Sequence, residues 1–170
     1  MNKVKPSKLL FVINPISGGT SKETLEESIY DFCQSHSINP NIYFTTGITE
    51  KDKENLLSIQ QQYQPDAIIA VGGDGTINLV AGQLVNTPTP IGILPAGSAN
   101  GLAKDLDIPE NIEEALQVIY RFNIKKIDTL KINDINCFHL SDFGFNARVC
   151  HRFADSLWRG KLSYVWFGLQ

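Results

Sequence analysis

The stretch AIIAVGGDGT at residues 67–76 decides the fold of this chain. Its first part, Ala67 to Val71, is apolar without interruption, which is typical of a strand buried on both faces of a parallel sheet. Glycines and an acid then lead to Thr76, where a helical pattern begins that runs to about Val85. A buried strand that passes through a glycine-rich turn into a helix is the repeating unit of α/β folds.

The same alternation of strand and helix patterns continues on both sides of this unit. The other predicted strands are 8–13, 41–45 and 91–94, and the other predicted helices begin near Ser21, cover 50–63, begin near Ser98 and cover 112–122. Strict alternation predicts a parallel sheet with helices on both faces. The predicted fold class is therefore a three-layer α/β fold.

The rhythm of the sequence changes after residue 124. A turn at residues 133–136 separates two short apolar segments and predicts a β-hairpin, and an aromatic-rich segment follows as far as Gln170. We therefore divide the chain into an α/β domain at 1–124 and a hairpin with a helical segment at 125–170, which leads into a truncated, β-rich second domain. Because the sequence stops within an apolar stretch, we expect the chain to be a fragment of a longer protein.

Composition excludes several classes of protein. The 170 residues include 15 Lys and Arg against 18 Asp and Glu, and 42% are hydrophobic, which is typical of a packed globular domain. A formal charge of −3 argues against a dedicated nucleic-acid binder. No apolar run is long enough to span a bilayer, and the three cysteines lack the spacing of a zinc site. We expect a cytoplasmic protein. The alternative is a peripheral protein at the inner membrane surface.

Three glycine-rich turns follow predicted strands. They read NPISGG at 14–19, GGDGT at 72–76 and PAGSANG at 95–101. The carboxyl ends of parallel strands are where α/β sheets bind ligands, and a glycine turn before a helix directs N–H groups and partial positive charge at an anion. The three turns predict a ligand that carries phosphate. The alternative, that each turn is glycine-rich for steric reasons alone, is weaker for three turns than for one.

The sequences of these turns resemble those of a known family. GGDGT resembles a signature shared by NAD kinases, diacylglycerol kinases and sphingoid-base kinases, and NPISGG resembles the NPxSG opening of the lipid kinases. LPAGSANGLA at 94–103 is similar to their LPxGTxN(D)xA segment, and SDFGFNARV at 141–149 is similar to the SxGFxAxV that follows it. On these four motifs the chain is identified as a member of the diacylglycerol kinase catalytic domain family.

The resemblance implies that the chain binds ATP with Mg²⁺. The residues that it places at the nucleotide are Asn14, Ser17, Thr45, Gly72, Gly73, Asp74, Gly75, Thr76, Ile77, Asn78, Gly97, Ser98 and Asn100. Thr46 is the alternative to Thr45 at the end of the second strand. Asp74 is the predicted catalytic residue and metal ligand, since an acid in an anion pocket needs a cation or a proton to hold. The alternative role for Asp74 is a helix N-cap.

The resemblance implies an ATP-dependent lipid kinase, with this chain as its ATP-binding lobe and a lipid at the membrane surface as its second substrate. Gly101 stands where diacylglycerol kinases commonly have Asp, so the segment is more similar to that of sphingoid-base kinases, and both acceptors stay open. An NAD kinase-like enzyme and a catalytically silent nucleotide-binding module are the alternatives.

The family's general base belongs to the downstream domain, so we expect this chain alone to be inactive. We also expect no nucleic-acid partner, and a homodimer formed through the exposed apolar segment at 162–167.

Overall fold

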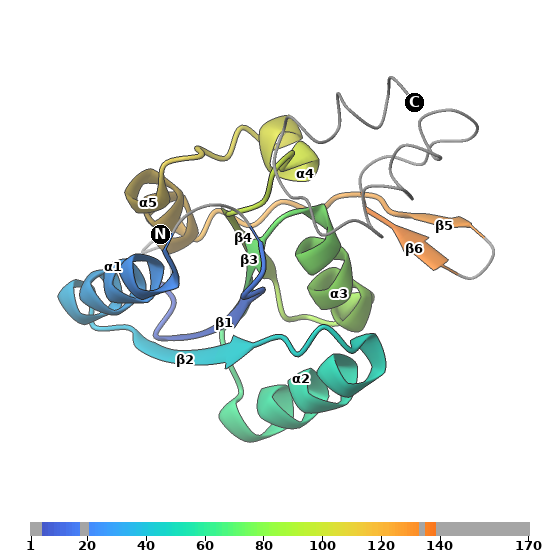
Figure 1. Cartoon of the computed structure of the whole chain (residues 1–170), viewed down its shortest axis with the longest axis horizontal. Coiled ribbons are helices and arrows are strands. Elements are labelled where there is room, and N and C mark those ends of the chain that lie inside the picture. The colour runs from blue at the N-terminus through green and yellow to red at the C-terminus, as the bar shows by residue number, and fades with distance from the viewer. Residues whose placement is uncertain (1–4, 18–20, 133–134, 139–170) are drawn as a thin grey trace.

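In the computed structural model, residues 5–17, 21–132 and 135–138 are described. Their centre is a parallel four-stranded sheet in the order β2-β1-β3-β4 (Figure 1). The strands are β1 (Lys8–Ile13), β2 (Asn39–Phe44), β3 (Ala67–Gly72) and β4 (Ile91–Pro95). The predicted α/β class and parallel sheet are confirmed.

Helices cover both faces of the sheet, as Figure 1 shows. The two longest on opposite faces are α1 (Lys22–Ser35) and α2 (Thr49–Tyr63). The other three are α3 (Asp74–Leu84), α4 (Gly101–Asp105) and α5 (Ile112–Arg121). The buried side chains of α1 and α5 share one apolar core, and those of α2, α3 and α4 share the other.

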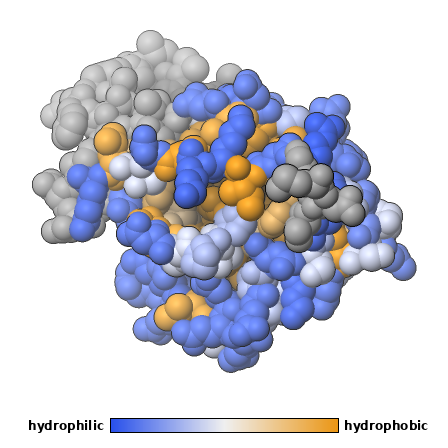
Figure 2. All heavy atoms as spheres, turned by 180° about the vertical axis from the view of Figure 1, so that it is seen from behind, coloured by the Kyte–Doolittle hydropathy of each residue, from blue (hydrophilic) through white to orange (hydrophobic). Residues whose placement is uncertain are grey.

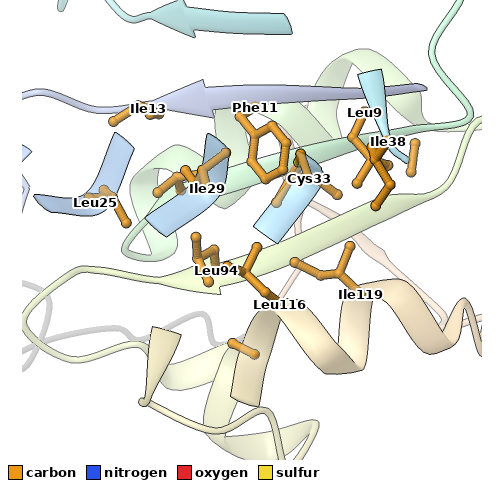
Figure 3. Close-up of a cluster of buried hydrophobic side chains, with 14 residues drawn as sticks. Leu9, Phe11, Ile13, Leu25, Ile29, Cys33, Ile38, Leu94, Leu116 and Ile119 are labelled. Atoms are coloured by element: carbon orange, nitrogen blue, oxygen red, sulfur yellow. The ribbon is translucent and has the colours of Figure 1, made fainter. Parts of the chain in front are cut away.

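The alternation of side chains along β1 separates the two cores. Leu9, Phe11 and Ile13 point toward α1 and α5, where Figure 3 shows them packed with apolar side chains from both helices. Leu10 and Val12 point to the opposite face, under α2 and α3. All five are at most 1% exposed. Full burial of such a side chain stabilises a fold by roughly 1.5–3 kcal/mol, so both faces of β1 fix its register.

The order of the strands places a topological switch point between β1 and β3. From β1 the chain moves outward to β2, whereas from β3 it moves in the other direction to β4. At the carboxyl ends, Asn14 after β1 donates its backbone N–H to the carbonyl of Val71 in β3, at 3.1 Å. In open α/β sheets, ligands bind in the crevice at such a switch point.

Three predicted boundaries were wrong. The second strand begins at Asn39 rather than 41, because Asn39 and Pro40 pair with β1 at the edge of the sheet, where the missing N–H of proline is tolerated. The third helix begins at Asp74 rather than Thr76, because the Gly73 carbonyl already accepts the N–H groups of residues 76 and 77. The helix expected near Ser98 begins only at Gly101.

The predicted hairpin is present, with a shorter turn. Its strands are β5 (Leu130–Ile132) and β6 (Ile135–Cys137), which pair antiparallel. The SDFGFNARV motif and the apolar segment at 162–167 lie outside the described residues. None of the helices in the described part of the chain is long and apolar enough to cross a bilayer.

Candidate functional site

A cavity of about 500 Å³ opens at the carboxyl ends of the strands, between α2 and α3. Asn14, the loop after β2 and the first turns of α2 form one part of its wall, and the exposed side of α3 forms another. Asn136 and Phe138, from the end of the hairpin, complete it. The lining residues are Asn14, Thr45, Gly47, Thr49, Asp52, Lys53, Gly75, Thr76, Asn78, Leu79, Gly82, Gln83, Asn136 and Phe138.

Small residues open the α3 wall of this cavity. A Cβ added to Gly75 or to Gly82 would meet no atom within 4 Å. The two glycines lie seven positions apart and so share one face of the helix. There is therefore open space beside α3 at both glycine positions.

Thr76 lines the cavity and has an unsatisfied hydroxyl. The residue is 4% exposed, and its Oγ1 is buried without a hydrogen-bond partner among the described residues. A Cβ on Gly72 would lie 2.3 Å from this Oγ1, so the hydroxyl packs directly on the glycine backbone. An unpaired buried hydroxyl costs about 1–3 kcal/mol, and in native proteins it calls for an explanation such as a ligand. The hydroxyl fits an anion bound at the amino-terminal end of α3.

The third glycine loop, at 95–101, packs directly on the second, at 72–76. A Cβ on Gly97 would lie 2.4 Å from the Cα of Gly73, a distance that real side chains do not reach. Asn100, with a left-handed φ of 54°, closes the loop on itself: its Oδ1 accepts the Gly97 N–H at 2.9 Å, and its Nδ2 donates to the Gly97 carbonyl at 3.0 Å. This closed turn is the reason that α4 begins at Gly101 and not near Ser98.

Asp74 connects the two loops. Its carboxylate accepts the backbone N–H of Gly101 through Oδ2 and that of Leu102 through Oδ1, each at 3.0 Å. Asp74 therefore caps the amino-terminal end of α4, a different helix from the one that it begins. The sequence suggested a cap as the alternative role, but not which helix would receive it.

The first glycine loop is described only as far as Ser17. The Oδ1 of Asn14 accepts the Ile16 N–H at 3.1 Å, and the Ser17 hydroxyl donates to the Asn14 carbonyl at 2.8 Å. Asn14 lines the cavity, whereas Ser17 is not among the lining residues. The rest of this loop, at 18–20, lies outside the described residues.

The two threonines at the end of β2 point in different directions. Thr45 is buried and lines the cavity, and its N–H donates to the Ile13 carbonyl at 2.9 Å. Thr46 instead turns its hydroxyl to Asp52, at 2.9 Å. Of the two predicted candidates, Thr45 is the one placed to meet a ligand in the cavity.

Asp52 is a residue that the sequence analysis missed. It is 2% exposed and lines the cavity from the first turns of α2. Burial alone would raise the pKa of its carboxyl, but hydrogen bonds from the Thr46 backbone, the Tyr43 hydroxyl and the Thr46 hydroxyl outweigh burial and lower it. An acid in the first turn of a helix, just after a Thr-Thr-Gly turn, was the available signal for it.

The structure brings only some of the predicted site residues together. Asn14, Thr45, Gly75, Thr76 and Asn78 line the same cavity. The remaining predicted residues do not line it: Ser17 lies in the first glycine loop, Gly72, Gly73 and Asp74 form the turn before α3, Gly97, Ser98 and Asn100 belong to the adjoining loop, and Ile77 is buried in the core. No group of three or more His, Cys, Asp or Glu that could hold a metal occurs in the described ranges.

A second cavity, of about 560 Å³, lies along the outer edge of β4. Aliphatic side chains from α3, α4 and α5 line much of it, among them Leu84, Leu106 and Ile119. Seen from behind, the molecular surface is mainly hydrophilic, with apolar side chains gathered near its middle (Figure 2). Of the predicted site residues, only Ile77 lines this second cavity, so the first is the candidate site.

Comparison with known proteins identifies the family of this chain. The family model of the diacylglycerol kinase catalytic domain matches residues 8–132, which include the four strands of the parallel sheet and all three glycine-rich turns. The chain belongs to the diacylglycerol kinase catalytic domain family. The matched segment begins at β1 and ends with β5, so the family covers every predicted site residue.

Among the curated relatives of this chain are proteins named as probable lipid kinases. Over 94% of its length the chain is 31% identical to "Probable lipid kinase YegS-like" of Enterobacter sp. (strain 638), and it covers 54% of that protein. Over its whole length it is 37% identical to "Uncharacterized protein sll0036" of Synechocystis sp., of which it covers 41%. The chain thus spans about half the length of the curated relatives that it matches.

Solved structures of the family share the fold. A diacylglycerol kinase from Bacillus anthracis str. Sterne superposes on 79% of the chain with a TM-score of 0.68 and 26% sequence identity. The match covers 49% of that kinase. The likeness in fold therefore extends over the part of the diacylglycerol kinase that corresponds to this chain.

Proposed function

We propose that this chain is the ATP-binding lobe of a lipid kinase, which transfers the γ-phosphate of ATP to a lipid hydroxyl. The observation that carries the proposal is the cavity between α2 and α3, which Thr76 lines with its unpaired hydroxyl. Family membership supports it, because named relatives are lipid kinases. ATP fits the cavity chemically, since its phosphates would supply the acceptor that the hydroxyl lacks.

Each group around the cavity has a role in this proposal. The amino-terminal end of α3 directs partial positive charge at the phosphates, and Thr76 donates a hydrogen bond to one of their oxygens. Asn14 and Thr45 would contact the same nucleotide from the ends of β1 and β2. Phosphoryl transfer depends mainly on positioning and on neutralising charge, so a lobe of this composition is suited to the donor half of the reaction.

Mg²⁺ fits this lobe only in part. When bound together with ATP, the ion would neutralise charge that develops on the phosphates. Asp74 is the acid beside the phosphate turn, and each of its oxygens already accepts one backbone N–H. A carboxylate oxygen has a second lone pair, so Asp74 retains the capacity to bind the ion directly or through water. The other ligands would come from ATP and solvent.

The acceptor half of the site is proposed to lie in the region that the relatives have beyond this match, which accounts for about half of their length. The acceptor is a lipid hydroxyl of the diacylglycerol or sphingoid class. Gly101 stands where diacylglycerol kinases commonly have Asp, so this loop contributes no acid of its own beside Asp74. This segment favours neither class decisively, so the assay compares both.

The proposal is tested by following radiolabelled phosphate from ATP into diacylglycerol and into a sphingoid base, in mixed micelles, with the protein at its natural length. We expect label in one of the two lipids and none with Asp74→Asn. NAD as the acceptor is the control for an NAD kinase-like activity. Label in NAD alone would overturn the lipid assignment, and ATP binding without transfer to any acceptor would indicate a silent nucleotide-binding module.

A further inference from the structure

Asp52 is a charged side chain that is almost entirely buried beside the candidate site. One of its oxygens, Oδ1, accepts three hydrogen bonds: from the Tyr43 hydroxyl at 2.7 Å, the Thr46 N–H at 2.8 Å and the Thr46 hydroxyl at 2.9 Å. Three donors satisfy a buried carboxylate that would otherwise be costly to desolvate. These bonds fasten the end of β2 to the first turns of α2.

The network continues on both sides of Asp52. The side-chain amide of Asn55, one turn further along α2, donates to the Tyr43 hydroxyl at 3.0 Å. On the other side, the Thr46 hydroxyl accepts the backbone N–H of Ile48 at 3.3 Å. The connecting loop is therefore hydrogen-bonded to the Asp52 carboxylate through Thr46, and the Ile48 carbonyl also accepts the Asp52 backbone N–H at 2.9 Å.

This loop and the start of α2 form one wall of the cavity. Thr45 and Gly47 line it from the loop, and Thr49 and Lys53 line it from the helix. Gly47 has a φ of +80°, a left-handed conformation that only glycine adopts easily, so the loop has a specific and demanding backbone shape. Asp52 lies where these two parts of the wall meet.

We propose that Asp52 is a positioning residue for the nucleotide: its carboxylate holds the loop at residues 45–48 against α2, and so preforms one wall of the ATP cavity. The inference rests on the proposed function, in which this cavity holds ATP. A preformed wall lowers the conformational entropy that is lost on binding. The three donors also direct the negative charge of Asp52 at the loop, so that it repels the phosphates less.

Asp66 offers a matched control with the same chemistry in a different place. Its Oδ2 accepts the Ser7 N–H at 2.7 Å, the Lys8 N–H at 2.9 Å and the Ser7 hydroxyl at 3.0 Å. Asp66 precedes β3 and therefore lies at the amino-terminal ends of the strands, opposite the cavity. Asp66 is exposed, and its change to Asn weakens a similar set of hydrogen bonds without touching the cavity wall.

The test compares Asp52→Ala, Asp52→Asn and Asp66→Asn by calorimetric titration with Mg·ATP and by thermal melting. We expect all three variants to have lower melting temperatures than the wild type. The dissociation constant for ATP should rise roughly tenfold in Asp52→Ala, by less in Asp52→Asn, which keeps an acceptor oxygen, and by less than about twofold in Asp66→Asn. Tyr43→Phe, which removes one of the three donors, serves if Asp52→Ala does not fold.

Two readouts separate positioning from a merely structural role and from direct contact. Amide hydrogen exchange at residues 46–48 should accelerate in the Asp52 variants alone. In those variants the affinity for 2′-deoxy-ATP should fall by the same factor as the affinity for ATP. Equal ATP affinity in Asp52→Ala and Asp66→Asn would overturn the inference and leave the proposed function intact. A loss for ATP but not for 2′-deoxy-ATP would also overturn it, because Asp52 would then contact the ribose. Failure of the wild type to bind ATP would overturn the proposed function itself.

Discussion

Asp74 and Leu102 lie 28 positions apart in the chain, yet the carboxylate of the first accepts the backbone N–H of the second at 3.0 Å. The neighbouring N–H of Gly101 donates to the other oxygen of the same carboxylate. One acid of the glycine turn at 72–76 thus fixes the helix that follows the glycine turn at 95–101. The two turns behave as one unit, with α4 held in place by the residue that the sequence analysis put forward for catalysis.

Replacement of Asp74 by Asn should therefore destabilise the fold as well as impair transfer. The amide would present an NH₂ group to one of the two backbone N–H donors, so we expect a loss of about 1–3 kcal/mol in the free energy of unfolding, measured with urea. Asp31, exposed on α1, is the control, and its change to Asn should leave stability within about 0.5 kcal/mol. Unchanged stability in Asp74→Asn would show that these two hydrogen bonds are dispensable.

The contact between the two glycine loops predicts opposite effects for two glycine substitutions. In Gly97→Ala the new Cβ would lie 2.4 Å from the Cα of Gly73, so backbone must move and we expect strong destabilisation or failure to fold. In Gly82→Ala the Cβ enters open space within a helix, where alanine should add about 0.5–1 kcal/mol of stability. Thermal melting measures both. A well-folded, equally stable Gly97→Ala would contradict the close approach of the loops.

Thr76→Val should separate stability from binding. The valine keeps the shape but removes a buried hydroxyl that lacks a partner, so the free energy of unfolding should stay the same or rise by about 1 kcal/mol. Nucleotide affinity should fall at the same time, whereas Thr76→Ser, which keeps the hydroxyl, should bind nearly as well as the wild type. A clear loss of stability in Thr76→Val would mean that the hydroxyl has a partner within the protein.

Two carboxyls should make the protein sensitive to acid. Burial opposes ionisation of Asp52 and Asp66, but hydrogen bonds from backbone N–H and hydroxyl groups lower the pKa of both. Their charged forms therefore stabilise the fold at any pH above the unfolded pKa of about 3.9, and this stabilisation is lost as the pH falls through the lower folded values. The Asp52→Asn, Asp66→Asn double variant should be less stable at pH 7 and lose less stability between about pH 4 and pH 2. An unchanged pH slope in urea denaturation would contradict this.

The sequence was sufficient for the architecture because that depends on local patterns. Ala67 to Val71 is an unbroken apolar run since β3 is buried on both faces, and the glycines after it mark the turn into α3. The places where prediction failed depend on contacts between distant residues. The start of α4 is set by Asn100 folding back on Gly97 and by the cap from Asp74, and neither is visible in helical periodicity.

The residues of the candidate site that belong to the glycine motifs were predictable from the sequence. The residues that other segments bring to the cavity were not. The glycine motifs identified Thr76 and Asn78 beside the cavity, whereas Asp52 has no motif of its own and acquires its place only when β2 and α2 bring Tyr43 and Thr46 against it. Similarly, Phe138 reaches the cavity because the hairpin folds back beside α3. Such residues come from segments whose position depends on the completed fold.

Calorimetric titration of the chain with Mg·ATP, alongside Thr76→Val and Thr76→Ser, tests most directly whether the cavity between α2 and α3 holds ATP. We predict one site per chain, weakened at least about fivefold by Thr76→Val and retained by Thr76→Ser, since a neutral hydrogen bond is worth about 1 kcal/mol. Saturation at about 100 times the dissociation constant should add about 2.7 kcal/mol of stability, visible as a higher melting temperature. No heat of binding and no thermal shift at millimolar Mg·ATP, or equal binding by all three proteins, would contradict ATP binding at this cavity.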